Sequence, residues 1–191
     1  PDLNGPTEIL AELRGAQRPA LDFYDNPGEI RPALEQINRA WLAAWRGVRA
    51  ICHRLGGWFF WMRIWSDRPA VDLQSDVSCL VSRELFDEYF LPFIEQQTRW
   101  AERTIYHLDG PGAIRHLDSL LSLPRLTAVQ WVPGAGAPAA VHWIPLARRI
   151  LAAGKRLFLD CEPGEVRTLA QELRPEGLML STRCASEEEA R

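Results

Sequence analysis

The sequence predicts an α/β protein built around a parallel sheet, and three observations support this fold class. From residue 71 onward, strand and helix patterns alternate through five successive units, which is typical of parallel sheets. The strands in these units are short apolar runs, as expected when both faces of a sheet are covered. Gly154-Lys155 and Pro175-Glu176-Gly177 fit the short turns that return a chain from a helix to the next strand.

The N-terminal part of the chain is predicted to be mainly helical. Residues 1–26 are rich in Pro, Gly and Asp and are expected to follow the surface around one short helix, Thr7 to Arg14, with Thr7 as its N-cap. A long helix is predicted from Pro27 to Leu55, because apolar residues recur at spacings of three and four and form one face. That face comprises Ile30, Leu34, Ile37, Trp41, Trp45 and Val48. Gly56-Gly57 ends the helix.

The remaining elements follow from apolar runs bounded by turn residues. Strands are predicted at 58–64 and 71–78, with Asp67-Arg68-Pro69 as the turn between them. Further strands are expected at 103–108, 126–132, 156–160 and 177–182, and helices at 82–101, 112–122, 141–153 and 163–173. A last helix is expected to begin at Ala185-Ser186-Glu187.

The length of 191 residues fits a single domain over 1–191. Five strand–helix units do not close an eight-stranded barrel, which usually needs about 250 residues. The pattern therefore leaves two arrangements open. One is an open, doubly wound sheet, and the other is the C-terminal part of a (β/α)8 TIM-type barrel whose first strands lie outside this sequence.

Composition excludes several classes of function. The net charge of -3 gives no basic footprint for nucleic acid or an anionic membrane. No apolar run approaches the roughly 20 residues that a membrane span needs, and the N-terminus does not resemble a secretory signal. The four cysteines are widely spread without a CxxC pair. Reduced, mostly buried thiols in a cytoplasmic protein are expected.

The strongest chemical signal is His107 and Asp109, which lie at the end of a predicted strand, two residues apart, so that both side chains can point the same way. Cys184 closes the last predicted strand. In a barrel the three side chains would gather at one mouth and could hold a zinc ion, which accepts nitrogen, oxygen and sulfur ligands. The alternative is a turn aspartate, a hydrogen-bonded core histidine and a core cysteine.

Other polar residues mark candidate catalytic and substrate-binding positions. Gln74 and Asp76 are predicted to share one face of a buried strand, where they could position a substrate or supply a second carboxylate to a metal; alternatively, Asp76 braces the helix that follows. The candidate substrate-binding residues are Gln130, Trp131, Trp143 and Asp160. The glycine-containing loop 133–136 lacks the dinucleotide and Walker patterns, and Asp160 could equally lie in a solvated loop.

Three segments together resemble the uroporphyrinogen decarboxylase superfamily, in particular its decarboxylase-like and corrinoid methyltransferase-like branch. The segments are Ile105-Tyr106-His107-Leu108-Asp109-Gly110-Pro111-Gly112, His116-Leu117-Asp118 and Val129-Gln130-Trp131-Val132-Pro133-Gly134. The same pattern is fitted by Pro1-Asp2-Leu3-Asn4-Gly5-Pro6, Gln74-Ser75-Asp76, Ser82-Arg83-Glu84-Leu85-Phe86, Gly154-Lys155 and Ser186-Glu187-Glu188-Glu189-Ala190. The resemblance covers nearly the whole chain but only the later part of the family's domain.

The resemblance implies a (β/α)8 barrel that lacks its first strands here, with the site at the C-terminal strand ends. Methyltransferase members of the family hold zinc through a His-x-Cys pair and a later Cys. His107 and Cys184 match the first and last of these ligands, whereas Asp109 stands in place of the middle Cys. True decarboxylases of the family use an arginine-rich N-terminal segment and an aspartate from the early barrel, and neither can be placed in this sequence.

Three functions are therefore considered. The first is a zinc-dependent methyltransferase that moves a methyl group from a corrinoid, carried by a partner protein, to a small thiol. The second is a cofactor-free lyase that decarboxylates a tetrapyrrole, for which Arg183 is the main cationic candidate. The third is an inactive partial barrel that serves as an interaction module, with exposed strand edges that favour a homo-oligomer.

Overall fold

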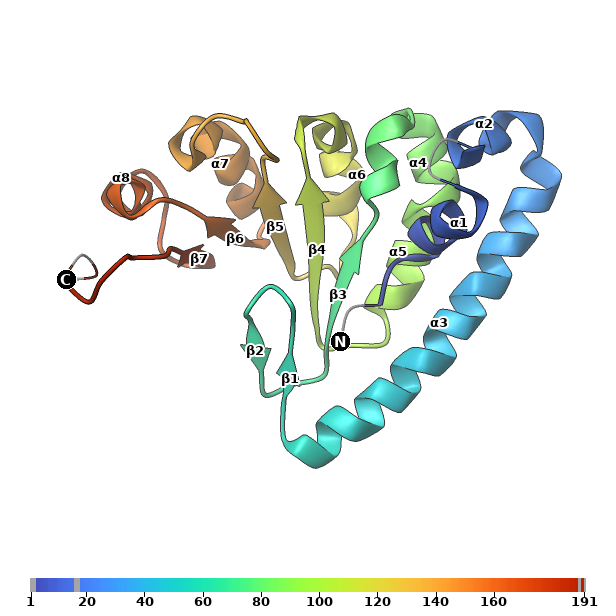
Figure 1. Cartoon of the computed structure of the whole chain (residues 1–191), viewed down its shortest axis with the longest axis horizontal. Coiled ribbons are helices and arrows are strands. Elements are labelled where there is room, and N and C mark those ends of the chain that lie inside the picture. The colour runs from blue at the N-terminus through green and yellow to red at the C-terminus, as the bar shows by residue number, and fades with distance from the viewer. Residues whose placement is uncertain (1–2, 16–17, 189, 191) are drawn as a thin grey trace.

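The computed structural model describes residues 3–15, 18–188 and 190, and its centre is a five-stranded parallel sheet. The strands follow one another in chain order, β3-β4-β5-β6-β7 (Figure 1). Their bounds are β3 (Ala70–Gln74), β4 (Arg103–Asp109), β5 (Ala128–Val132), β6 (Arg156–Asp160) and β7 (Leu178–Ser181). This order has no point at which the direction of winding reverses, as a doubly wound sheet would have. The sheet is open, with β3 and β7 at its two edges.

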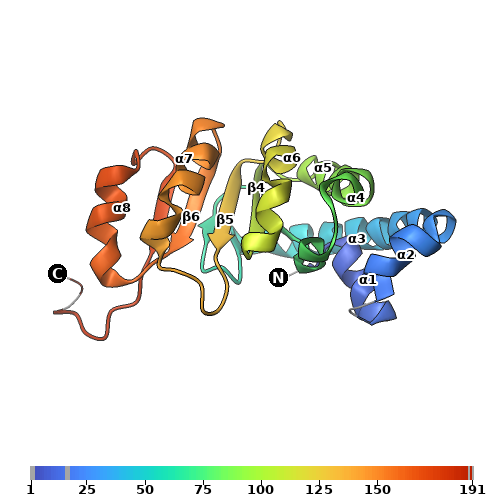
Figure 2. The ribbon, with the colours of Figure 1, turned by 90° about the horizontal axis from the view of Figure 1, so that it is seen from above.

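The connecting helices cover one face of the sheet (Figure 2). They are α4 (Arg83–Tyr89), α5 (Leu91–Thr98), α6 (Leu117–Ser122), α7 (Ile144–Ala152) and α8 (Val166–Glu172), with short 3-10 turns η1 (Asp76–Leu80), η2 (Pro111–His116), η3 (Ala140–Trp143) and η4 (Pro163–Glu165). Tyr106, Leu108 and Val129 point toward these helices and belong to the main core. Because side chains alternate along a strand, the residues between them face the other way.

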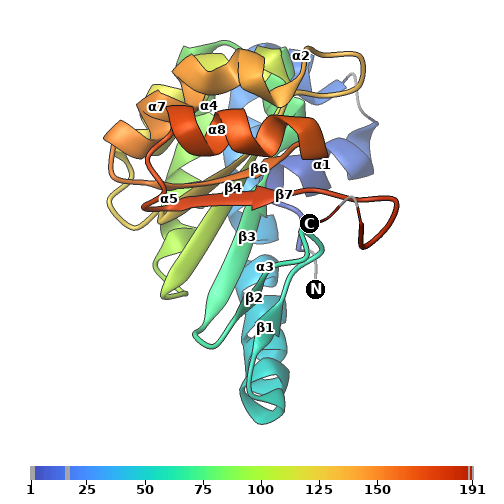
Figure 3. The ribbon, with the colours of Figure 1, turned by 90° about the vertical axis from the view of Figure 1, so that its left-hand side faces the viewer.

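The opposite face of the sheet is partly covered by a hairpin of β1 (Trp58–Phe59) and β2 (Trp65–Ser66), which pair antiparallel. Trp58, Phe60 and Met62 of this segment form a second, smaller core with sheet residues such as Ile105 and Phe158. Figure 3 faces the C-terminal edge of the sheet, where β7 is the outermost strand. His107 is two residues after Ile105 on β4, and Gln130 is in register with it on β5, so both point to the same face as the hairpin.

Three N-terminal helices complete the fold: α1 (Pro6–Arg14), α2 (Arg18–Asp25) and α3 (Pro27–Leu55). α3 packs against α1, and its Trp41 Nε1 donates a hydrogen bond to the Leu3 carbonyl. Gly5, rather than Thr7, precedes the first residue of α1. The Thr7 hydroxyl instead lies 2.8 Å from the Ser75 hydroxyl, which attaches α1 to the end of β3.

Several predicted elements differ from those observed. The helix expected at 82–101 is two helices, because Pro92 has no N–H to continue the first one. The strand expected at 58–64 turns back at residues 61–63 and becomes a hairpin, and the strand expected at 71–78 ends at Gln74. α2 was not predicted. The described residues of the segment that begins at Ala185 form bends and turns rather than a helix. Pro1, Asp2 and Glu189 of the motifs quoted above lie outside the described residues.

The four cysteines, all within the described part of the chain, are free thiols. Cys52 is buried, and Cys79, Cys161 and Cys184 are half-buried. Among the described residues, no helix combines the length and apolar character that crossing a membrane requires.

Candidate functional site

Asp76, His107 and Asp109 come together at the carboxyl ends of β3 and β4. One potential ligand atom from each lies within 4.8 Å of the other two. His107 and Asp109 are alternate residues of β4 and so share a face of the sheet. Asp76 begins η1, two residues after Gln74, which is in register with His107. The parallel register thus places a carboxylate from one strand end beside an imidazole and a carboxylate from the next.

The His107 side chain is buried and has two close neighbours. Its Nδ1 lies 2.7 Å from Oε1 of Gln130, the residue directly opposite on β5. The ring of Trp61, from the turn of the hairpin, approaches edge-on with its centroid 5.0 Å away and an interplanar angle of 78°. Both contacts come from elements distant in sequence. They restrict the orientation of the imidazole.

The residues around Asp76 are attached to the N-terminal segment. Gln74 Nε2 donates a hydrogen bond to Asn4 Oδ1 at 2.6 Å. The Val77 backbone N–H donates to a carboxylate oxygen of Glu8 at 3.2 Å. With the Thr7–Ser75 contact, three neighbours of Asp76 in the chain are bonded to α1 or to the residues just before it. The first helix therefore holds the segment that carries this carboxylate.

Negative charge accumulates at this end of the sheet. Burial raises the pKa of the Cys79 thiol, and the carboxylates of Asp76 and Asp109 raise it further. Burial also raises the pKa of Glu8, with a smaller contribution from Asp76 and opposed by the hydrogen bond from Val77. A bound cation would reverse the local field that these groups feel. The electrostatics are therefore suited to a positively charged ligand.

Cys184 is not a member of this group, although the sequence led us to expect it as a ligand. Cys184 does not close the last strand, because β7 ends at Ser181, three residues earlier. The order of the strands also separates β7 from β4. β4 and β7 are separated by β5 and β6, so three spacings of about 4.8 Å place their ends about 14 Å apart along the sheet. Only strong curvature could bring the two ends together, and this sheet is open. Asp76 takes the third position.

The other predicted site residues divide between the two faces of the sheet. Gln130 contacts His107, and Gln74 is bonded to Asn4 rather than to the carboxylates. Trp131 lies on the opposite face, buried in the main core with its ring centroid 4.9 Å from that of Trp143. It cannot line a site shared with Gln130, because consecutive strand residues point to opposite faces. Trp143 is therefore part of this packing as well.

Asp160 ends β6 and lines a hollow of about 430 Å³ at the same edge of the sheet. Its carboxylate accepts a hydrogen bond from Arg63, which belongs to the hairpin turn. Glu162, Glu165 and Arg183 also line this hollow. The sequence identified Asp160 but gave no signal for Arg63 or Trp61, since both reach the edge only through the path of the hairpin.

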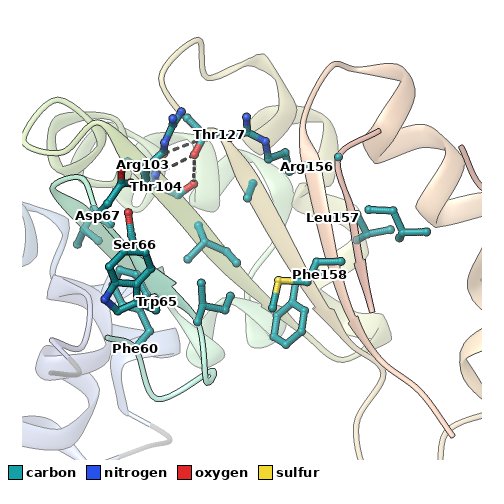
Figure 4. A pocket seen from close by; sticks show the side chains of 18 residues that line it. Phe60, Trp65, Ser66, Asp67, Arg103, Thr104, Thr127, Arg156, Leu157 and Phe158 are labelled. Atoms are coloured by element: carbon teal, nitrogen blue, oxygen red, sulfur yellow. Dashed lines mark hydrogen bonds between the residues drawn. The ribbon is translucent and has the colours of Figure 1, made fainter. Parts of the chain in front are cut away.

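A second hollow, of about 450 Å³, lies at the opposite, amino-terminal ends of the strands (Figure 4). The hairpin and the sheet enclose it, with Phe60 and Phe158 among its apolar walls. The Thr104 and Thr127 side chains, also in its wall, bond to the backbone of each other's strand. Phe60 and Phe158 pack the hairpin onto the sheet here, and the hollow lies at the opposite end of the strands from Asp76, His107 and Asp109.

The chemistry of the three donors fits a divalent metal ion. Zinc accepts imidazole nitrogen and carboxylate oxygen, and catalytic zinc sites commonly have three protein ligands with one open position. Imidazole with two carboxylates also suits other first-row divalent ions, which differ in affinity according to the Irving–Williams order. The residues present can therefore hold a metal, and the donor set alone does not select one element.

Comparison of the chain with protein-family models, with curated proteins and with solved structures finds no match. The functional argument therefore depends on the residues themselves.

Proposed function

We propose that this protein is a metal-dependent enzyme that transfers a methyl group from a corrinoid, presented by a partner protein, to a small thiol. The observation that carries the proposal is the convergence of Asp76, His107 and Asp109 at the carboxyl ends of neighbouring parallel strands. Ligand sites of α/β proteins lie at this end of the strands. The resemblance of the segment around His107 to corrinoid methyltransferase-like proteins supplies the reaction type.

Zinc is the ion that we propose for the site; when bound, it would lower the pKa of a coordinated thiol and supply a thiolate nucleophile. The chain's own residues would bind the ion and orient the substrate. Asp76 and Asp109 contribute negative charge, and His107 contributes a neutral nitrogen. Trp61 covers one side of the imidazole and limits the access of water to it.

The hollow lined by Arg63 and Asp160 is the proposed place for the remainder of the substrate, because it opens at the same edge of the sheet. Its charged groups do not favour the tetrapyrrole decarboxylase alternative. Such a substrate carries several carboxylates and needs unpaired cations. Here Asp160 already neutralises Arg63, and the carboxylates of Glu162 and Glu165 line the same hollow as Arg183.

We further propose that the sheet is the later part of a (β/α)8-type barrel. The sequential strand order and the placement of helices α4 to α8 on one face support this arrangement. In such a barrel the face that carries His107 would be the interior and the mouth would surround the three donors, so the β1–β2 hairpin, which packs on this face here, would have to leave it. The open edges at β3 and β7 are where further strands of such a barrel would pair.

Metal analysis of the purified full chain tests the proposed site. One equivalent of zinc is expected after equilibration with a zinc buffer, and none in His107→Ala. His142→Ala is the matched control, since His142 belongs neither to the group of three donors nor to the lining of the hollow, and should leave the zinc content unchanged. Methyl transfer from methylcobalamin to a series of thiols then tests the reaction. Failure of the wild-type chain to retain zinc would rule out the proposed function.

A further inference from the structure

The contact between His107 and Gln130 indicates which nitrogen of the His107 imidazole carries the proton. The two residues are directly opposite on β4 and β5, and their side chains leave the same face of the sheet. Only 8% of His107 and 2% of Gln130 is exposed to solvent. The 2.7 Å distance from Nδ1 to Oε1 is that of a good hydrogen bond. Water therefore has little access to compete for either atom.

The polarity of this hydrogen bond follows from the atoms involved. An amide oxygen can only accept, so Nδ1 must carry the proton. In a neutral imidazole the other nitrogen, Nε2, then carries the lone pair. Histidine ligands of metals characteristically donate the second ring N–H to such a partner, which determines both the tautomer and the orientation of the ring.

We infer that Gln130 is a positioning residue: it holds His107 in the Nδ1–H tautomer and thereby reserves Nε2 for a metal ion shared with Asp76 and Asp109. This inference rests on the proposed function as far as the metal is concerned. The tautomer itself is a property of the metal-free protein. The two parts can therefore fail separately.

The surroundings of the pair support a role in orientation. The Trp61 ring packs edge-on against one side of the imidazole. This contact restricts the rotation of the imidazole away from Gln130. Gln130 is a neutral partner and leaves His107 without an additional negative charge beside Nδ1. A glutamate at the same position would still accept the hydrogen bond, whereas a methionine of similar length would not. This pair of substitutions separates the hydrogen bond from simple packing.

The tautomer is measured by nitrogen NMR of the metal-free full chain with isotope-labelled histidine, at a pH well above the usual histidine pKa of about 6.5. The His107 signals are assigned by their loss in His107→Ala. The wild type and Gln130→Glu are expected to show the Nδ1–H tautomer. Gln130→Met is expected to show a mixture or the Nε2–H form. Gln97→Met, which alters a buried glutamine that bonds to Asn38 instead, should leave His107 unchanged.

Zinc affinity is the second readout, measured by competition with a chromophoric chelator. Gln130→Met is expected to bind zinc roughly 10- to 100-fold more weakly, as is usual when such a partner of a metal-binding histidine is removed. Gln130→Glu should bind at least as tightly as the wild type. An Nε2–H tautomer in the wild type would overturn the inference, even if the variants fail to fold. So would a Gln130→Met protein that keeps the Nδ1–H form.

The two proposals give different results when they fail. A wild-type chain that binds no zinc but shows the Nδ1–H tautomer, lost only in Gln130→Met, contradicts the proposed function and supports the positioning role of Gln130. A chain that binds zinc through Nδ1 of His107 supports the function and overturns the inference. Nitrogen NMR of His107 with and without added zinc, compared between wild type and Gln130→Met, distinguishes these cases, because it reports which ring nitrogen carries the proton and which binds the ion.

Discussion

Arg63 donates a hydrogen bond from Nη2 to Oδ1 of Asp160 at 2.8 Å, across 97 residues of the chain. The same guanidinium nitrogen lies 3.3 Å from the Ser181 hydroxyl. The turn of the hairpin is thus bonded to the ends of β6 and β7, while Trp61, two residues earlier, contacts His107 at the end of β4. One short segment spans the edge of the sheet at which the candidate site lies.

Asp160→Asn is expected to loosen the hairpin without unfolding the protein. Both partners of the ion pair are about half exposed, so the loss of unfolding free energy should stay within about 1 kcal/mol. Backbone amides of the turn, including Arg63, should exchange with solvent faster. Glu172→Gln is the control, because it removes a similarly exposed ion pair with Arg148 on the helical side. Equal exchange at the turn in both variants would show that Asp160 does not hold the hairpin.

Asp76→Asn and Cys184→Ser compare the ligand set in the structure with the one expected from the sequence. Asp76→Asn should weaken zinc binding at least about tenfold, or about 1.4 kcal/mol, because it removes a charged ligand from the group. Cys184→Ser should leave the affinity unchanged. Isothermal titration of the two variants provides the measurement. If Cys184→Ser bound zinc more weakly than Asp76→Asn, Cys184 would be identified as the third ligand instead of Asp76.

Gly5→Ala should destabilise the protein, since a Cβ there would lie 2.5 Å from the Gln74 carbonyl oxygen. The end of β3 or the start of α1 would have to move, and zinc binding through Asp76 should weaken as well. Gly47→Ala is the matched control, because it lies within α3 and its Cβ would meet nothing within 4 Å. It should stabilise the protein by about 0.5–1 kcal/mol. Urea unfolding of both variants tests the contrast.

Stability is expected to fall as the pH decreases through the ordinary range of histidine titration, because of His116. Burial lowers the pKa of this residue, whose Nε2 donates to the Ser78 carbonyl at 2.9 Å while the ring stacks on Phe86. Below a pH of about 6.5 the unfolded chain therefore binds a proton that the folded chain does not. The unfolding free energy should fall by up to about 1.4 kcal/mol per pH unit from this group.

His116→Gln removes the titrating group and should reduce this slope, although it also lowers stability at neutral pH. Urea unfolding at several pH values compares the two slopes. His53→Gln, on the exposed end of α3, should keep the slope of the wild type. An unchanged slope in His116→Gln would mean that other groups cause the dependence on pH.

Part of the candidate site could be predicted from the local sequence. His107 and Asp109 end a strand at a spacing of two, and that spacing alone places them on one face. The same alternation could have separated Gln130 from Trp131, which are consecutive and must point to opposite faces. Their shared position at a strand end predicts one pocket for both, whereas the structure places Trp131 in the core. Position along a strand identifies a pocket residue only together with the alternation of the side chains.

The sequence by itself determined the alternation of strands and helices and the position of His107 and Asp109, because apolar periodicity and turn residues act over a few neighbours. Only the tertiary structure decided that Asp76 rather than Cys184 joins them, that Gln130 lies opposite His107, and that Trp61 reaches the imidazole. These contacts depend on strand order, register and the path of a hairpin. They arise when the whole chain packs into one core, and no short segment encodes them.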